Sequence, residues 1–205
     1  MKFISVFAAL AACAIALTAS ASADTQQQAA ARSGIDNATY CIAEGGVVQE
    51  RIPEFGTNNS NPLKLSGSAY FCQFTQKKGG SQINVLLSTL GTTKPTLAAL
   101  AYYAKVKIGS CEGNPGSCYC TLLGGTDLFG GANLDGGGWV LKSDPTDVLE
   151  TCMFPDQSSI DSWGLTYHSA GIIRGKNLSG VLKYANPHKT VRSFIPHKNN
   201  GFPFQ

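Results

Sequence analysis

The stretch Tyr40-Cys41-Ile42-Ala43-Glu44-Gly45-Gly46-Val47 recurs 79 residues later as Tyr119-Cys120-Thr121-Leu122-Leu123-Gly124-Gly125-Thr126. In each copy, three residues separate a tyrosine and cysteine pair from two adjacent glycines. This spacing is typical of a short helix that ends at a glycine able to take a left-handed conformation. The block therefore predicts a helical cysteine in each half of the chain and indicates an internal repeat.

Three further pairs of segments follow this block in the same order, at separations of 77 to 81 residues. Agreement of a whole series at nearly constant separation is much harder to obtain by chance than agreement of one block. We therefore expect two tandem units, residues 36–106 and 107–186. The three further pairs are 70–74 with 150–154, 81–84 with 158–161, and 96–104 with 177–185.

The segment around the second cysteine of each unit resembles a strand, because apolar residues alternate along it. We expect 83–87 and 160–167 to form one or two further strands, and about 95–105 and 178–185 to be helical. The predicted fold class is α+β: two tandem small disulfide-stapled units, each a short helix followed by antiparallel strands and a second short helix. The alternating residues are Tyr70, Cys72 and Phe74, then Cys152 and Phe154.

The first 23 residues have the three parts of a secretory signal peptide. Lys2 is followed by an apolar run over 3–17 and by the small-residue exit Ala21-Ser22-Ala23. That run is shorter than the roughly 20 residues needed to cross a bilayer, so a transmembrane segment is not expected. We predict a secreted protein, extracellular or periplasmic if the source is a Gram-negative bacterium, with a flexible segment over 24–35 and an extended C-terminal tail over 187–205.

One of the seven cysteines, Cys13, lies inside the predicted signal, which leaves an even number for an oxidising compartment. The sequence alone permits 15 pairings of the remaining six. The repeat favours Cys41–Cys72 and Cys120–Cys152, which close equivalent loops, and leaves Cys111–Cys118. A metal site at Cys118-Tyr119-Cys120 with Cys111 is disfavoured because zinc sites place two residues between paired cysteines.

Residues 114–167 carry the motifs Asn114-Pro115-x-Ser117-x-Tyr119-Cys120-x-x-x-Gly124-Gly125 and Cys152-x-Phe154-Pro155-Asp156-x-Ser158-x-Ile160-Asp161-x-Trp163. This pattern resembles DUF333, a family of short exported bacterial domains often called putative hemolysins, and 37–87 resembles a diverged second copy. The insertion over 128–149 exceeds the usual hairpin of the family. No mechanism is established for the family, so the resemblance implies an exported α+β domain and no catalytic residue.

Composition restricts the function classes further. The formal net charge is +3, and the basic residues are scattered without aromatic neighbours, so we expect no nucleic-acid partner. We assign no catalytic residue, no metal and no cofactor. Carboxylates that would permit a hydrolase lie mostly in turn-like sequences, where aspartate serves local hydrogen bonding; they are Asp127, Asp135, Asp144, Asp147, Glu150, Asp156 and Asp161.

An aromatic binding face is the remaining candidate site, because aromatic side chains supply large contact areas at low entropic cost. Its expected members are Phe154, Trp163, Tyr167 and His168. The alternative is that these residues form the core of a small sheet, which is the favoured interpretation for Trp163. For His168 the simplest expectation is an exposed position at the end of a strand.

The favoured function is that of a secreted non-enzymatic binding protein: an effector, an inhibitor or a virulence-associated factor. Its expected partner is an extracellular protein or a glycan, and the sequence leaves the oligomeric state open. A membrane-active hemolysin-like protein and a small secreted hydrolase are the two alternatives. Asn37, Asn58 and Asn177 begin Asn-x-Ser/Thr sequons and would accept glycans in a eukaryotic source.

Overall fold

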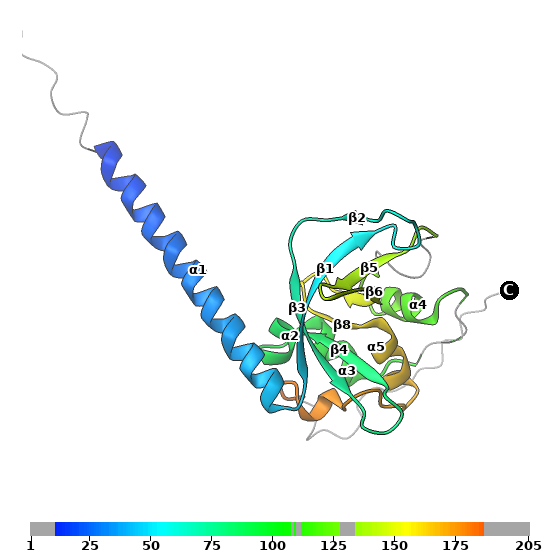
Figure 1. Ribbon diagram of the computed structural model, residues 1–205. Coiled ribbons are helices and arrows are strands. Elements are labelled where there is room, and N and C mark those ends of the chain that lie inside the picture. The colour runs from blue at the N-terminus through cyan, green and yellow to red at the C-terminus, as the bar shows by residue number, and fades with distance from the viewer. Residues whose placement is uncertain (1–10, 108, 110–111, 128–133, 187–205) are drawn as a thin grey trace, which may run out of the picture.

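The computed structural model describes residues 11–107, 109, 112–127 and 134–186, with side chains from residue 26 onward. One mixed α and β body results, in which helices pack against an eight-stranded sheet (Figure 1). The helices are α1 (Ala11–Ala43), α2 (Leu87–Gly91), α3 (Leu97–Ala104), α4 (Pro115–Leu122) and α5 (Ser162–Ser169), followed by the 3-10 turn η1 (Leu178–Gly180). The strands are β1 (Val47–Phe55), β2 (Leu63–Lys64), β3 (Ala69–Thr75), β4 (Gln82–Leu86), β5 (Gly137–Leu141), β6 (Asp144–Leu149), β7 (Thr151–Met153) and β8 (Ser159–Asp161).

The sheet is antiparallel and curls back on itself. Its strand order is β6-β5-β1-β3-β4-β8-β7, with β2 beside β1. Strands β6 and β7 lie at opposite ends of this order, yet only Glu150 separates them in the chain. Because one residue spans only about 3.5 Å, the two ends of the sheet must lie close together.

Strands from both halves of the chain share this sheet. Strand β1 pairs with β5 from Arg51–Leu141 to Phe55–Gly137, and β4 pairs with β8 at Val85–Ile160. The segments 36–106 and 107–186 are therefore joined by strand pairing instead of standing as separate stapled units. The α+β class is confirmed, and the duplication stays a prediction from the sequence.

The two repeated blocks form the same local structure, and both disulfides that the repeat favoured are present. Gly45 and Gly124 take φ angles of 82° and 81° at the helix ends. A Cβ atom added at Gly46 or at Gly125 would come within 2.4 Å of a disulfide sulfur. The first glycine thus ends the helix, and the second leaves room for the disulfide. Cys118 is disulfide-bonded, and its expected partner Cys111 lies outside the described residues.

Helix α1 is much longer than the short helix expected before Gly45. It extends away from the body (Figure 1), and the segment 24–35, which we expected to be flexible, lies inside it. Asn37 lies within this helix, which begins far upstream, and its side chain packs against Gly91. None of the described helices is both long and apolar enough to cross a membrane. The predicted tail over 187–205 lies outside the described residues.

The prediction of strand structure through 160–167 is wrong beyond Asp161, where α5 begins. Asp161 accepts a hydrogen bond from the backbone N–H of Gly164 and so caps the helix. The apolar alternation of 163, 165 and 167 imitated a strand, whereas burial follows the helical spacing of Ser162, Leu165 and His168. Near the C-terminus, the helix expected over 178–185 is only the turn η1, capped by Asn177.

One face of the sheet packs against the helices and forms a single core around both disulfides; its strand residues include Cys72, Phe74, Ile83 and Val85. Cross-strand partners point to the same side of a sheet, so the register shows which side chains lie on the opposite face. That face is partly polar. It carries the side chains of Gln49, Arg51, Phe71, Gln73, Gln82, Asn84 and Trp139.

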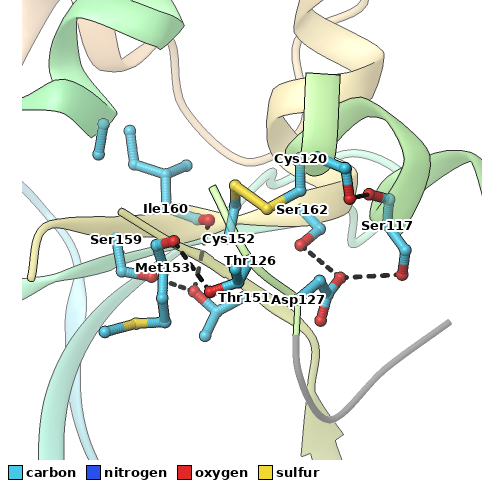
Figure 2. The surroundings of a disulfide bond; sticks show 12 residues. Ser117, Cys120, Thr126, Asp127, Thr151, Cys152, Met153, Ser159, Ile160 and Ser162 are labelled. Atoms are coloured by element: carbon cyan, nitrogen blue, oxygen red, sulfur yellow. Dashed lines mark hydrogen bonds between the residues drawn. A yellow bond between two sulfur atoms is a disulfide. The ribbon is translucent and has the colours of Figure 1, made fainter. Parts of the chain in front are cut away.

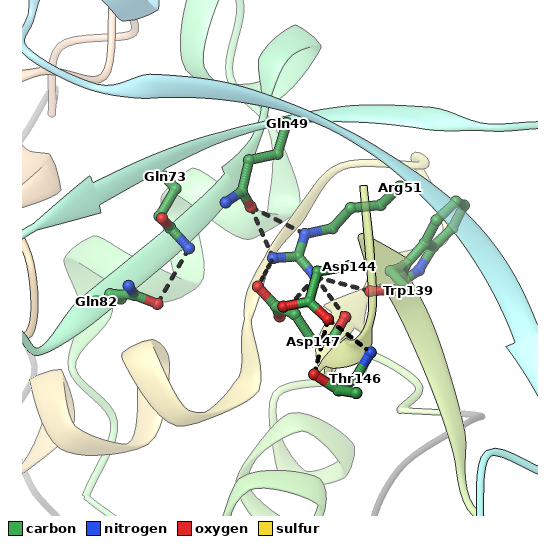
Figure 3. Close-up of polar contacts among 8 residues, drawn as sticks. All are labelled: Gln49, Arg51, Gln73, Gln82, Trp139, Asp144, Thr146 and Asp147. Atoms are coloured by element: carbon green, nitrogen blue, oxygen red, sulfur yellow. Dashed lines mark hydrogen bonds and ion pairs between the residues drawn. The ribbon is translucent and has the colours of Figure 1, made fainter. Parts of the chain in front are cut away.

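Arg51 is the centre of the polar face, at 1% exposure (Figure 3). Its guanidinium donates to both carboxylate oxygens of Asp147 at 3.0 and 3.1 Å and to Oε1 of Gln49. It also donates to the carbonyl oxygens of Trp139 and Asp147. These bonds hold the β5–β6 hairpin against β1. The hairpin makes up most of the insertion over 128–149 that was noted in the sequence.

Candidate binding site

Trp163 lies at the start of α5 and is half-buried. A hydrogen bond on the protein side of its ring holds the indole in place. Its indole N–H donates to Oε2 of Glu150 at 3.1 Å. Glu150 also accepts from the side-chain amide of Asn114, which caps α4. Glu150 is the single residue between β6 and β7, where the two ends of the sheet meet. Its carboxylate therefore connects this point to the start of α4 and to the Trp163 indole.

Tyr167 lies one helical turn beyond Trp163 and is 38% exposed. The two ring centroids are 6.0 Å apart with a 34° angle between planes. The guanidinium of Arg174 lies 5.3 Å from the centre of the Tyr167 ring, within the range of a cation–π interaction. No described residue forms a hydrogen bond or ion pair with the Arg174 guanidinium.

These three side chains border an open pocket of about 590 Å³. Its other walls come from the loop between β3 and β4 and from the segment after α5. We call this group the aromatic pocket; its lining residues are Gln76, Ser81, Trp163, Tyr167, Ile172, Ile173 and Arg174. Aromatic rings beside one arginine and an amide suit a ligand that has both an apolar face and polar groups.

Two of the four residues expected in an aromatic binding face line this pocket and two do not, and that the pocket binds a partner stays a prediction. Trp163, for which a place in the core was the favoured interpretation, is half-buried. Trp163 and Tyr167 line the aromatic pocket, whereas Phe154 is 5% and His168 2% exposed, and both belong to the interior. Arg174, Gln76 and Ser81 were missed, since nothing in their local sequence links segments nearly 100 residues apart. The i and i+4 spacing of Trp163 and Tyr167 would have indicated a shared surface once the helix was known.

His168 is a buried residue of α5 and not the exposed strand end that we expected. Its ring stacks on Tyr102 of α3 at 3.7 Å with an angle of 7°. No hydrogen bond of normal geometry reaches either ring nitrogen within the described part of the chain. Burial, together with the nearby charge of Lys105, lowers the pKa of His168 to about 4. The imidazole is therefore neutral in the folded protein at neutral pH.

Acid is expected to destabilise the protein through His168. Its folded pKa lies below the usual 6.5, so its contribution is complete above pH 6.5 and is lost as the pH falls toward 4. Between pH 7 and pH 5, the free energy of unfolding should fall by about 2 kcal/mol more in the natural protein than in His168→Phe. Urea unfolding of both proteins at the two pH values measures this difference.

The comparison with His168→Phe is needed because Asp161 acts in the opposite direction. Burial raises the pKa of Asp161 to about 6, so its contribution is present below pH 3.8 and is lost as the pH rises through 6. Asp161 is the same in both proteins and cancels in the difference. Parallel stability curves for the two proteins would contradict the assignment of a neutral, buried His168.

Carboxylates within 114–167, the range that carries the quoted motifs, serve the scaffold. Oδ2 of Asp127 accepts hydrogen bonds from the hydroxyls of Ser117 and Ser162, beside the Cys120–Cys152 disulfide (Figure 2). These two bonds link α4 and α5 to the chain segment after the paired glycines. The hydrogen bonds of Asp127 therefore have a structural role.

Asp156 and Ser158, from the Pro-Asp-x-Ser part of the motif, cap a helix that is distant in sequence. Oδ2 of Asp156 accepts from the N–H of Leu97 at 2.7 Å, and the Ser158 hydroxyl accepts from the N–H of Ala98 at 2.9 Å. The Thr96 hydroxyl accepts from Ala99, so Thr96 is the cap residue of α3. Partial burial raises the pKa of Asp156, but hydrogen bonds from Ser158 and from the N–H of Leu97 outweigh it and lower this pKa.

The three sequons differ in accessibility. Asn37 is 8% exposed and packed against Gly91, which leaves no room for a glycan in the folded protein. Asn58 and Asn177 are exposed. The side-chain oxygen of Asn177 accepts from the backbone of Ser179 and from the Tyr102 hydroxyl.

A second, larger groove of about 740 Å³ lies between α1 and the sheet. Its walls include Ala30, Gly34, Ile35, Val48 and Tyr70, and none of the described residues that line it carries a charged side chain. The groove therefore offers an apolar surface without a group that would select a ligand class.

Within the described ranges, no three His, Cys, Asp or Glu side chains lie close enough together to hold a metal ion. Comparison with known proteins found no matching family model, no similar curated protein and no similar solved structure. The resemblance to DUF333 thus stays a prediction from the quoted motifs, and the functional argument depends on the geometry of the site.

Proposed function

We propose that this protein is a secreted, non-enzymatic binding protein and that the aromatic pocket contacts its extracellular partner, a protein or a glycan. The observation that carries this proposal is the group formed by Trp163, Tyr167 and Arg174. Tryptophan, tyrosine and arginine are the residue types most enriched among those that dominate binding energy. Here they lie together at an open pocket.

Pre-organisation of the pocket supports the same proposal. The Trp163 indole is held by Glu150, and the Tyr167 ring is packed between Trp163 and Arg174. A rigid aromatic surface loses little side-chain entropy when a partner binds. The commitment of Asp156, Asp161 and Glu150 to backbone and side-chain donors favours binding over hydrolysis.

Replacement of Tyr167 by alanine is expected to remove binding without unfolding the protein, because this side chain is partly exposed at the rim of the pocket. The measurement compares both proteins on a printed glycan array and on a panel of immobilised extracellular matrix proteins. Loss of a central aromatic contact typically weakens binding by about tenfold or more.

Tyr70→Ala is the matched control, since Tyr70 is 49% exposed on β3 and lines the larger groove instead. Its binding should equal that of the natural protein. A partner bound equally by the natural and Tyr167→Ala proteins would contradict the proposal, as would the absence of binding to every member of both panels. A loss confined to Tyr70→Ala would move the site to the larger groove.

A further inference from the structure

We infer that the aromatic pocket recognises an acidic saccharide, a chain of sugar rings that carry carboxylates. This inference deepens the proposed function and rests on it. The inference depends on what one open pocket combines: the guanidinium of Arg174, which has no ion-pair partner among the described residues, the ring faces of Trp163 and Tyr167, and neutral polar groups.

The first step concerns charge. Among the described residues that line the pocket, Arg174 is the only charged one. Its guanidinium is placed by its contact with Tyr167 and has no acidic partner among the described residues. Asp161, whose charge Arg174 does influence, lies buried beneath and accepts from the backbone of Asn84 and Gly164. An arginine placed in this way can bind a carboxylate of the ligand through two parallel hydrogen bonds.

The second step concerns shape. Trp163 and Tyr167 lie one turn apart on α5, and the pocket that they border is open to solvent. A sugar ring has an apolar C–H face that can pack on an aromatic ring, and hydroxyls at its edge that need hydrogen-bond partners. Gln76 and Ser81 line the same pocket and supply an amide and a hydroxyl. Lys77 and Lys78 follow Gln76 in the loop and are exposed, which adds positive charge beside the pocket.

The third step distinguishes a saccharide from an acidic peptide. Extended peptides commonly bind by adding a strand to a free sheet edge. Strands β3 and β4, whose connecting loop borders the pocket, pair with each other as far as Thr75–Gln82, whereas β3 pairs with β1 only up to Gln73 and β4 pairs with β8 only at Val85. The backbone N–H of Asn84, on the outer side of β4, donates to Asp161. The outer edge left beside this pocket is therefore only about two residues long on each strand among the described residues, which is too short for a peptide to add as a further strand, and side-chain recognition of a sugar ring fits better.

The experiment is a titration of the purified natural protein followed by its tryptophan fluorescence, in which Trp163 lies at the pocket and Trp139 of β5 is not among the lining residues. The probes are trigalacturonate, its methyl ester, which lacks the charges, and triglutamate. We expect saturable binding of trigalacturonate, at least tenfold weaker binding of the ester, and weakening by added salt. Arg174→Gln should weaken binding of trigalacturonate about tenfold or more, whereas Arg32→Gln, at an exposed arginine of α1, should leave it unchanged.

Each other outcome overturns the inference in a recognisable way. Equal binding of the acid and the ester, with both lost in Tyr167→Ala, would leave a binding protein whose ligand is neutral. Stronger binding of triglutamate that depends on Arg174 would identify an acidic peptide. No binding of any probe would overturn the acidic saccharide, while the glycan and protein panels decide the proposed function separately. Matching circular dichroism spectra would show that Arg174→Gln and Arg32→Gln fold as the natural protein does.

Discussion

The double variant Cys41→Ala/Cys72→Ala is expected to lose about 4 kcal/mol of its free energy of unfolding. The cause is the entropy of the unfolded chain, because the disulfide closes a loop with a sequence separation of 31 residues. Such a loss is a large fraction of the 5 to 15 kcal/mol by which small domains are typically stable. Urea unfolding of the natural and variant proteins under non-reducing conditions measures it.

The second disulfide provides a matched test. Cys120–Cys152 spans 32 residues, so Cys120→Ala/Cys152→Ala should lose nearly the same amount. All four cysteines lie in the one core cluster. Removal of both disulfides should therefore destabilise the whole body and unfold it in a single transition. A loss below about 1 kcal/mol for either pair, or two separate transitions, would contradict this expectation.

Asp147→Ala is expected to lose about 3 kcal/mol, more than Arg51→Met loses. Removal of the carboxylate leaves the guanidinium of Arg51 at 1% exposure with only neutral partners. Removal of the arginine leaves a carboxylate that is 37% exposed and can reach water. The asymmetry follows from burial, because the cost of an unpaired charge depends on its access to solvent.

A double-mutant cycle with Arg51→Met/Asp147→Ala checks this result, since the double variant should recover part of the loss of Asp147→Ala. The control is Glu50→Ala at the residue before Arg51 on β1, which breaks the ion pair with Lys142, the residue that follows β5. Lys142 is 58% exposed, and salt and water screen that pair, so its loss should be the smaller one. Equal losses for Asp147→Ala and Glu50→Ala would show that burial of Arg51 does not set the energetics.

The repeated cysteine block was the most predictable part of the fold. A glycine with positive φ at a helix end and a second glycine against a sulfur are local requirements, and they follow from the lack of a Cβ atom. The sequence therefore predicted both described disulfides and the end of each helix. It did not predict the length of α1, because the segment 24–35 was expected to be flexible.

The binding site was only partly predictable for a related reason. The sequence identified Trp163 and Tyr167 as aromatic residues that could bind a partner. Whether each of them faces the pocket or the interior depends on α5 being a helix. Assigning a strand placed His168 at its exposed end, whereas the helix turns it onto Tyr102 in the interior. The pocket also needs Arg174 beside the β3–β4 loop, which is a tertiary contact.

The sequence by itself determined the α+β class and the glycine ends of the two cysteine-bearing helices, because glycine conformation acts over short distances along the chain. Its repeat favoured the Cys41–Cys72 and Cys120–Cys152 pairings, which the structure contains. Only the tertiary structure decided that both halves share one curled sheet, through the pairing of β1 with β5 and the Arg51–Asp147 bond. It alone also placed Arg174 beside Tyr167 at the aromatic pocket. Such contacts join segments far apart in the sequence, and they form because burial in one shared core fixes where each strand and helix lies.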